Sequence, residues 1–242
     1  MNMPRLVSFR ALFKKRFTCP LCDYRGSFVD LDLPTGFRKY AQCPNCKALE
    51  RHRLQFLVFN EVFNDTKTEG MTILHVAPES VFCALFKKRF GHYESADLSM
   101  DGVDHKVDLQ NLPFCDASYD VVYASHVMEH ISDDRKALSE ISRILRPNGI
   151  AILPVPIVVN TTVEYPDPNP KEEWHVRAPG MDYYERYKTI FQRVDIYDSD
   201  AFPAKHQGYI YEDRSYWPTE ACPLRTSMQG KKHVDIVPVC YK

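Results

Sequence analysis

From residue 71 onward, short apolar runs alternate with segments that carry apolar residues at helical spacing. Residues 71–76 form a mostly apolar run after a polar stretch, and this pattern predicts a buried strand. The same pattern predicts, in chain order, a helix at 79–90, strands at 93–96, 103–107 and 119–124, a helix at 133–145, a strand at 150–155, a helix at 181–191, and strands at 193–197 and 234–240. Strands separated by helices form parallel sheets, so we expect an open, doubly wound, mostly parallel seven-stranded α/β sheet.

The segments before residue 71 differ from this pattern. Residues 47–63 place their apolar side chains on one helical face, and a cysteine-containing stretch precedes them. At ~100–200 residues per domain, a chain of 242 residues allows one catalytic-size domain and a small appendage. We therefore expect a basic N-terminal arm at 1–18, a small unit at 19–46 and the main domain at 47–242.

Two stretches of the main domain lack a regular pattern. Residues 160–180 contain a proline-rich run at 165–170, which predicts no regular element. Residues 201–230 contain several tyrosines and a tryptophan, which suit either a planar ligand or a core. We expect both segments to act as lids or substrate loops.

Four cysteines occur in two identical spacings, Cys19-x-x-Cys22 and Cys43-x-x-Cys46. Two such turns close a shell of four thiolates around Zn²⁺ at ~2.3 Å per sulfur. The alternative, a pair of disulfides, would need an oxidising compartment. The spacing therefore predicts a zinc ribbon whose closed site is structural, because no ligand position remains for water.

Charge is distributed unevenly along the chain. Residues 1–60 carry 11 Lys and Arg against 4 Asp and Glu, whereas residues 61–242 carry 20 against 28, within a net charge of −1. The composition excludes intrinsic disorder and a globally basic nucleic-acid coat. No apolar run reaches the ~18–20 residues that span a bilayer, and the N-terminus lacks the pattern of a secretory signal. We expect a cytoplasmic protein; the composition of the basic N-terminal arm also allows a mitochondrial presequence.

Polar residues follow the predicted strands at the edge where α/β sheets bind ligands. Asp97 ends one strand, where an acid is well placed to bind both hydroxyls of a ribose. Asp108 follows the next strand, where an acid can reach an adenine amino group. These positions predict a nucleoside-binding edge.

Six motifs in series resemble those of class I S-adenosylmethionine-dependent methyltransferases. They lie at residues 73–79, 97, 108–114, 119–122, 125–130 and 144–149. The resemblance covers roughly residues 71–160. It is closest to a type 11 subgroup with an N-terminal zinc ribbon, a Leu-Glu-Arg-His-Arg stretch (here 49–53) and a later His-Val-Arg (here 175–177). It implies a Rossmann-like methyltransferase fold and S-adenosylmethionine as the cofactor.

The resemblance also implies which residues bind the cofactor. They are His75, Ala77, Pro78, Glu79, Asp97, Leu98, Asp108, Leu109, Ser125 and His126. Ala77 and Glu79 would approach the methionine and ribose portion, and Ser125 with His126 would line the floor under the sulfonium methyl. The first loop departs from the family, because His75 replaces an acid and Ala77-Pro78-Glu79 replaces glycines, which allow positive φ. We therefore expect this loop to contact the cofactor differently from the usual glycine-rich loop.

Three histidines are candidates for a general base, since an imidazole with an ordinary pKa of ~6.5 suits proton transfer at neutral pH. His126 should face the cleft, and His130 either does so or anchors the following helix. His175 lies beside Trp174 and Arg177, and these two are candidate substrate residues; the guanidinium suits an acceptor carboxylate or phosphate. The alternative for His175 and Arg177 is an anchor for the loop.

Three functions fit these observations. The first is methyl transfer to a hydroxyl or amine of a small molecule or glycan, which the acidic main domain favours. The second is RNA methylation, in which the basic head would hold phosphates. The third is a catalytically inactive domain whose ribbon recruits a partner. The sequence leaves the acceptor and the oligomeric state open.

Overall fold

The computed structural model describes residues 15–242, so most of the expected N-terminal arm lies outside the described residues. Its main feature is a seven-stranded sheet with the strand order β12-β14-β9-β8-β5-β6-β7. The strands of this sheet are β5 (Thr72–Val76), β6 (His92–Asp97), β7 (His105–Lys106), β8 (Tyr119–Ala124), β9 (Leu145–Ile152), β12 (Arg193–Asp198) and β14 (Ile236–Tyr241). Only β14 runs against its neighbours β9 and β12, which makes the sheet mixed but mostly parallel. The expected fold class is confirmed.

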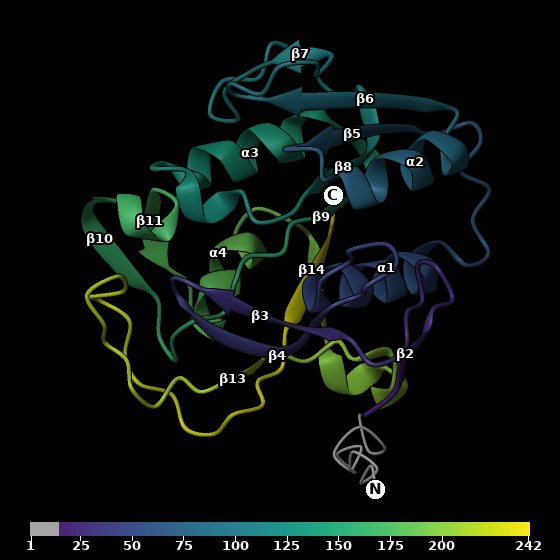
Figure 1. Ribbon diagram of the computed structural model, residues 1–242. Coiled ribbons are helices and arrows are strands. Elements are labelled where there is room, and N and C mark those ends of the chain that lie inside the picture. Colours follow the sequence, from purple (N-terminus) through teal and green to yellow (C-terminus); the bar gives the residue numbers. More distant parts are fainter. Residues whose placement is uncertain (1–14) are drawn as a thin grey trace, which may run out of the picture.

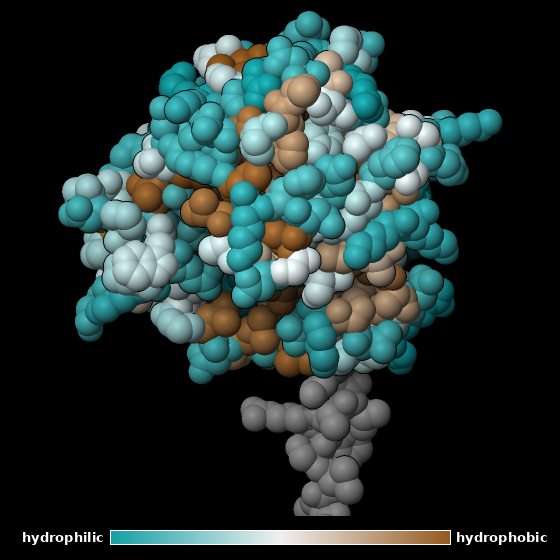
Figure 2. Space-filling model, turned by 90° about the horizontal axis from the view of Figure 1, so that it is seen from above, coloured by the Kyte–Doolittle hydropathy of each residue, from teal (hydrophilic) through white to brown (hydrophobic). Residues whose placement is uncertain are grey.

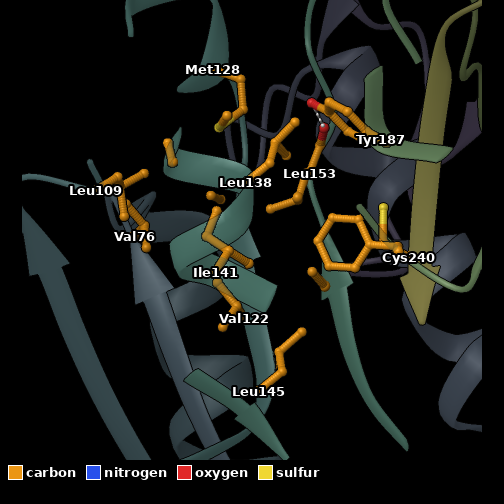
Figure 3. Close-up of a cluster of buried hydrophobic side chains, with 14 of the residues drawn as sticks. Val76, Leu109, Val122, Met128, Leu138, Ile141, Leu145, Leu153, Tyr187 and Cys240 are labelled. Carbon is orange, nitrogen blue, oxygen red and sulfur yellow. Dashed lines mark hydrogen bonds between the residues drawn. The ribbon is translucent and has the colours of Figure 1, made fainter. Parts of the chain in front are cut away.

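Helices cover both faces of the sheet (Figure 1). On one face α1 (Glu50–Phe63) and α2 (Ser80–Arg89) bury a largely aromatic core that includes Phe59, Phe82 and Phe86. On the other face α3 (Asp134–Ile144) and α4 (Glu185–Lys188) pack against a second, mostly aliphatic core. Figure 3 shows this second core, with Leu138 and Ile141 of α3 next to Val122 of β8.

Two expected boundaries are wrong for local reasons. The strand expected at 150–155 begins at Leu145, directly after α3, and residues 146–149 form an irregularity between its two paired parts. Asn148 adopts a φ of 64°, so the predicted Pro-Asn-Gly turn survives as a bulge inside β9. The helix expected at 181–191 is a 3₁₀ turn, Met181–Tyr184, followed by the short α4, and its tyrosines reach the backbone of residues 153–155.

The ribbon at the N-terminal side is built from short antiparallel strands. β1 (Phe17–Thr18) pairs with β2 (Arg25–Gly26), and β3 (Val29–Leu33) pairs with β4 (Gly36–Gln42). β13 (Tyr211–Glu212) adds a third strand beside β4. The ribbon therefore shares a sheet with β13 of the segment 201–230, and Figure 1 labels β13 beside β4.

The proline-rich run is a strand, so the expectation of no regular element at 165–170 is wrong. β10 (Val163–Asn169) pairs with β11 (His175–Ala178). The pairing is irregular between Glu164 and Asn169, where Pro166 and Pro168 lie. These prolines therefore need no ladder hydrogen bond, which is how an edge strand tolerates them.

Within the described part of the chain, the remaining regular elements are single 3₁₀ turns. They are Met128–His130, Pro170–Glu172, Ser199–Ala201 and Ala204–His206. Figure 2 shows one face of the molecule, which is mostly hydrophilic and broken by hydrophobic patches. Within residues 15–242, no helix has the length and apolar character needed to cross a bilayer.

Candidate functional site

The four ribbon cysteines converge on one point. Their Sγ atoms lie within 4.8 Å of one another, with 3.5 Å between Cys19 and Cys46 and 3.7 Å between Cys22 and Cys43. All four are free thiols. Sulfurs at the corners of a regular tetrahedron with ~2.3 Å bonds to zinc stand ~3.8 Å apart, whereas a disulfide requires ~2.05 Å. The arrangement fits a tetrahedral four-thiolate zinc site and does not form disulfides.

Each cysteine pair lies in a turn that is closed by a left-handed residue. Asp23 N donates to Cys19 O, and Lys47 N donates to Cys43 O, both at about 3 Å. Asp23 has a φ of 57° and Lys47 a φ of 63°. Neither residue is glycine, so the sequence gives no sign of this left-handed backbone. Only the Cys-x-x-Cys spacing indicates the site.

In the loop after β5, an alanine adopts the left-handed backbone conformation that glycine usually provides. Ala77 adopts a φ of 47°, and its N–H donates to Ala96 O at 2.8 Å. This bond ties the loop to the end of β6, where Asp97 lies. The Cβ of an L-residue costs roughly 1–2 kcal/mol in this conformation, so the loop holds local strain at the expected cofactor edge.

Replacing Ala77 by glycine is expected to raise the free energy of unfolding. Relief of the left-handed Cβ contact contributes ~1–2 kcal/mol, and the added freedom of glycine in the unfolded chain cancels part of that gain. We expect a net gain of ~0.5–1 kcal/mol in urea unfolding. As a control, Ala137→Gly in the middle of α3 should lower the stability. A loss of stability in Ala77→Gly would contradict this account of the loop.

Glu79 is held by the helix that leads out of the ribbon. Its Oε1 accepts from Arg51 Nη2 at 2.9 Å and lies 2.8 Å from His52 Nε2. Burial opposes ionisation of this carboxyl, but the hydrogen bond from His52 and the charges of His52 and Arg51 outweigh it and lower the pKa of Glu79. Sequence reasoning did not assign Arg51 or His52 to the site, although both belong to the Leu-Glu-Arg-His-Arg stretch that marked the family.

The two predicted nucleoside acids lie at the ends of neighbouring strands. Asp97 ends β6, and its Oδ1 accepts from the backbone N–H groups of Ser99 and Met100. Leu98, beside it, is 71% exposed. Asp108 follows β7 and is exposed, with its carboxylate bonded to Gln110. Leu109, by contrast, is buried in the core on the α3 side of the sheet.

His75 points into the core. Its ring packs edge-on against Phe86 and Tyr123, and its Nδ1 lies 3.1 Å from Tyr93 OH. Burial lowers the pKa of His75 to about 4, so the ring is neutral at pH 7. The imidazole therefore packs in the aromatic core beneath α2. Its side chain does not point toward the loop that contains Ala77 and Pro78.

Ser125 belongs to a buried polar network with α1. Gln55 Nε2 donates to Ser125 Oγ at 3.0 Å, and Tyr123 OH donates to Gln55 Oε1 at 2.6 Å. This network fixes the end of β8 against the helix that carries Arg51. Gln55 also comes from α1, and unlike Arg51 and His52 it belongs to no motif named above.

His126 turns the chain at the end of β8. It has a φ of 55°, and its N–H donates to Pro154 O at 2.9 Å. Burial and then the Arg51 guanidinium lower the pKa of His126 well below its ordinary value. Its Nδ1 lies 3.5 Å from Glu129 Oε1, and burial raises the pKa of Glu129 to about 8.

Two adjoining cavities open at this edge of the sheet. The smaller, of about 230 Å³, lies between the loops after β5 and β8 and includes Ala77, Glu79 and Ser125. The larger, of about 470 Å³, is walled by the β3–β4 hairpin of the ribbon and by residues 156–175 and 210–235. The residues that line both are Arg51, His126, Glu173 and His175.

The other predicted side chains fall into two groups. His130 and His175 come together at the smaller cavity, with their ring centroids 4.6 Å apart. Arg177 is 2% exposed and donates to the carbonyls of Met128 and Ile131, so it occupies the anchoring position given above as the alternative. Trp174 is 63% exposed and lines neither cavity.

Comparisons with known proteins agree with this architecture. The family model described as a methyltransferase domain matches residues 61–153. A methyltransferase of Mycobacterium sp. (strain KMS) is 44% identical over 101 residues, which cover 37% of this chain and 40% of that protein. An O-methyltransferase of Pyrenophora dematioidea is 38% identical over 85 residues, which cover 34% of this chain and 31% of that protein. The chain thus spans less than half the length of these curated relatives.

A solved structure shares the fold. It is a phosphoethanolamine N-methyltransferase of Haemonchus contortus in complex with phosphomonomethylethanolamine and S-adenosylhomocysteine. The match has a TM-score of 0.50 at 15% identity and covers 78% of this chain and 52% of that one. Residues 61–153 of this chain are therefore similar to the methyltransferase-domain family, and the sheet to which they contribute β5 to β9 has the fold of this N-methyltransferase.

Proposed function

We propose that the chain transfers a methyl group from S-adenosylmethionine to a hydroxyl or amine of a small molecule or glycan. The observation that carries the proposal is the pair of adjoining cavities at the carboxyl edge of the parallel strands. This is the edge at which open α/β sheets bind their ligands. The smaller cavity is the methyl-transfer point, and the larger one takes the acceptor.

The cofactor would lie along the loops that follow β5, β6, β7 and β8. The backbone from His75 to Pro78 and the side chain of Glu79 would face its methionine portion. Asp97 would bind the ribose hydroxyls, with Leu98, Asp108 and Leu109 around the adenine. Ser125 and His126 would lie under the methyl group. The cofactor supplies a methyl on an activated sulfonium, so the main task of the protein is to align the acceptor with it.

The acceptor cavity has the size of a small-molecule site, for which ~300–1,000 Å³ is typical. The arginines on its wall are paired with carboxylates, as in Arg38 with Glu50 and Arg225 with Glu172, so the cavity is not a bare cationic channel for nucleic acid. His126 lies between the two cavities, and its Nε2 is buried with no hydrogen-bond partner among residues 15–242. In this proposal that nitrogen would accept the proton of an acceptor hydroxyl or amine.

Zinc in the ribbon would support this site without taking part in the chemistry. Cys19, Cys22, Cys43 and Cys46 would hold one Zn²⁺ with a closed shell of thiolates. The β3–β4 hairpin that follows the first pair supplies Leu31 to the acceptor cavity. The ion would therefore fix one wall of the cavity.

Calorimetric titration of the zinc-replete protein tests the proposal. Micromolar binding of both S-adenosylmethionine and S-adenosylhomocysteine is the expected result. Transfer of radiolabelled methyl to members of a panel of sugars and small metabolites would then identify the acceptor. No heat and no thermal shift at millimolar ligand would overturn the proposal and favour an inactive binding domain.

Asp97→Ala is expected to weaken S-adenosylmethionine binding by ~1.5–3 kcal/mol, or ~10–150-fold, because the ribose hydroxyls lose charge-assisted hydrogen bonds. The matched control is Asp101→Ala, four residues later, where the carboxylate is 96% exposed and pairs with Lys106. Titration calorimetry of both variants measures the difference. An unchanged affinity in Asp97→Ala would remove Asp97 from the site.

A further inference from the structure

A second group of metal-ligating side chains lies at the edge of the smaller cavity. One ligand atom from each of Glu129, His130 and His175 lies within 4.8 Å of the other two. Glu129 and His130 come from the 3₁₀ turn after β8, and His175 begins β11. Two imidazoles and one carboxylate are a common ligand set for divalent transition metals.

Glu129 and His175 are buried without the partners that buried polar groups normally have. Glu129 is 1% exposed, and neither of its carboxylate oxygens has a hydrogen-bond partner among the described residues. His175 is 8% exposed, and its Nδ1 has no hydrogen-bond partner within the same part of the chain and lies 4.0 Å from Glu172 Oε2. Burial of an unpaired polar group is unfavourable unless another ligand forms the missing interaction. A cation bound between them would do so.

The surrounding structure holds the two segments together. Arg177, two residues after His175, donates to the carbonyls of Met128, Ile131 and Ser132, which flank the turn with Glu129 and His130. Before His175, Glu173 and Trp174 adopt φ values of 54° and 66°. Two successive left-handed residues that are not glycine cost energy, and such strain gathers at functional sites. Backbone strain at Glu173 and Trp174 therefore accompanies the position of His175 in the cluster.

We propose that Glu129, His130 and His175 bind a divalent transition-metal cation, separate from the metal of the cysteine ribbon. With bonds of ~2.0–2.2 Å to nitrogen and carboxylate oxygen, modest side-chain rotation would bring the three atoms onto one ion. Two imidazoles favour Zn²⁺, Fe²⁺ or Co²⁺ over Mg²⁺, which prefers oxygen ligands. Three protein ligands leave coordination positions open toward the cavity.

The role of this cation rests on the proposed function, although its binding does not. His175 lines both cavities, so a cation bound there would also face the acceptor. It would polarise an acceptor hydroxyl and lower its pKa, and the released proton would pass to a base such as His126 or to water. This assigns an oxygen-bearing acceptor to the larger cavity.

Cobalt titration of the full-length apoprotein tests the site in the absence of cofactor and acceptor. We expect two equivalents of Co²⁺ to bind. One should give the thiolate charge-transfer absorption of the four-cysteine site, and the other should give only d–d bands from nitrogen and oxygen ligands. Mg²⁺ in excess should not displace the second equivalent. A single equivalent with only the thiolate spectrum would overturn the proposal.

Single substitutions locate the second equivalent. Glu129→Gln and His175→Asn should each reduce cobalt binding from two equivalents to one while the thiolate spectrum persists, which also reports that the ribbon is folded. Glu185→Gln and His92→Asn, which alter exposed residues outside the cluster, should keep both equivalents. Two equivalents retained in both cluster variants would place the ion elsewhere and sink the assignment. Because no S-adenosylmethionine is present, failure of this test is distinct from failure of methyl transfer.

Discussion

A chain carrying Cys19→Ser and Cys43→Ser is expected to lose the ribbon metal and, with it, the folded structure of residues 19–46. In zinc-finger peptides the apparent free energy of zinc binding is about 10–16 kcal/mol, and that energy drives folding. The ribbon core is small and includes the cysteines themselves, so without the metal that core is too weak to keep the ribbon folded. Loss of the thiolate charge-transfer band in cobalt titration, together with fast amide hydrogen exchange at 19–46, measures the effect.

The matched control for this double variant is Cys115→Ser, because Cys115 is an exposed free thiol outside the ribbon. It should keep the thiolate band and the slow exchange of the ribbon. A full thiolate spectrum in the double variant would show that other residues bind the ion. Slow exchange without metal would show that the ribbon folds independently of it.

Arg53→Met is expected to lower the free energy of unfolding by ~3–5 kcal/mol. Arg53 is fully buried, and its guanidinium donates to the carbonyls of Ala41 in the ribbon, of Ala48 directly after it, and of His206 and Gln207 in the main domain. Burial lowers its pKa to about 10, so the side chain is still charged at neutral pH. Methionine keeps much of the volume but leaves these carbonyls without their donor.

Urea unfolding of Arg53→Met measures this loss, with Arg135→Met as the control at an exposed position of α3. The control should change the stability by less than ~0.5 kcal/mol, as surface substitutions usually do. Arg53→Lys should recover only part of the stability, because an ammonium cannot reproduce the planar fork of donors. A loss in Arg53→Met no larger than in the control would mean that the ribbon and the main domain are held together by other contacts.

The sequence predicted those parts of the fold that local periodicity encodes. The strand expected at 119–124 has those bounds in β8, and the helix expected at 133–145 differs from α3 by one residue at each end. β10 was missed because its prolines lie where the pairing is irregular, which depends on the partner strand rather than on the run itself. The pairing of β13 with β4 joins segments about 170 residues apart, and no local pattern reports such a contact.

Site residues that belong to a sequence motif could be predicted, whereas residues that the fold brings to the site from other segments could not. Asp97 and His126 follow strands, so their position at the sheet edge could be expected. Arg51 and Gln55 reach the site from α1, which precedes the methyltransferase motifs. Glu129 lies between His126 and His130 in one motif, but the motif gave it no role. The left-handed backbone of Ala77 has no sequence signal, because alanine seldom adopts it.

The bonds of Arg53 set an order of events during synthesis of the chain. The ribbon leaves the ribosome early, but Gln207, which accepts from Arg53, lies 154 residues further on. At ~5–20 residues per second, that interval takes on the order of 10–30 s. Until then a newly made ribbon has neither the carbonyl of Gln207 nor the strand β13 beside β4. The nascent chain therefore exposes an unpaired β4 edge and a guanidinium that is only half bonded, and both become protected only when the C-terminal third has been made.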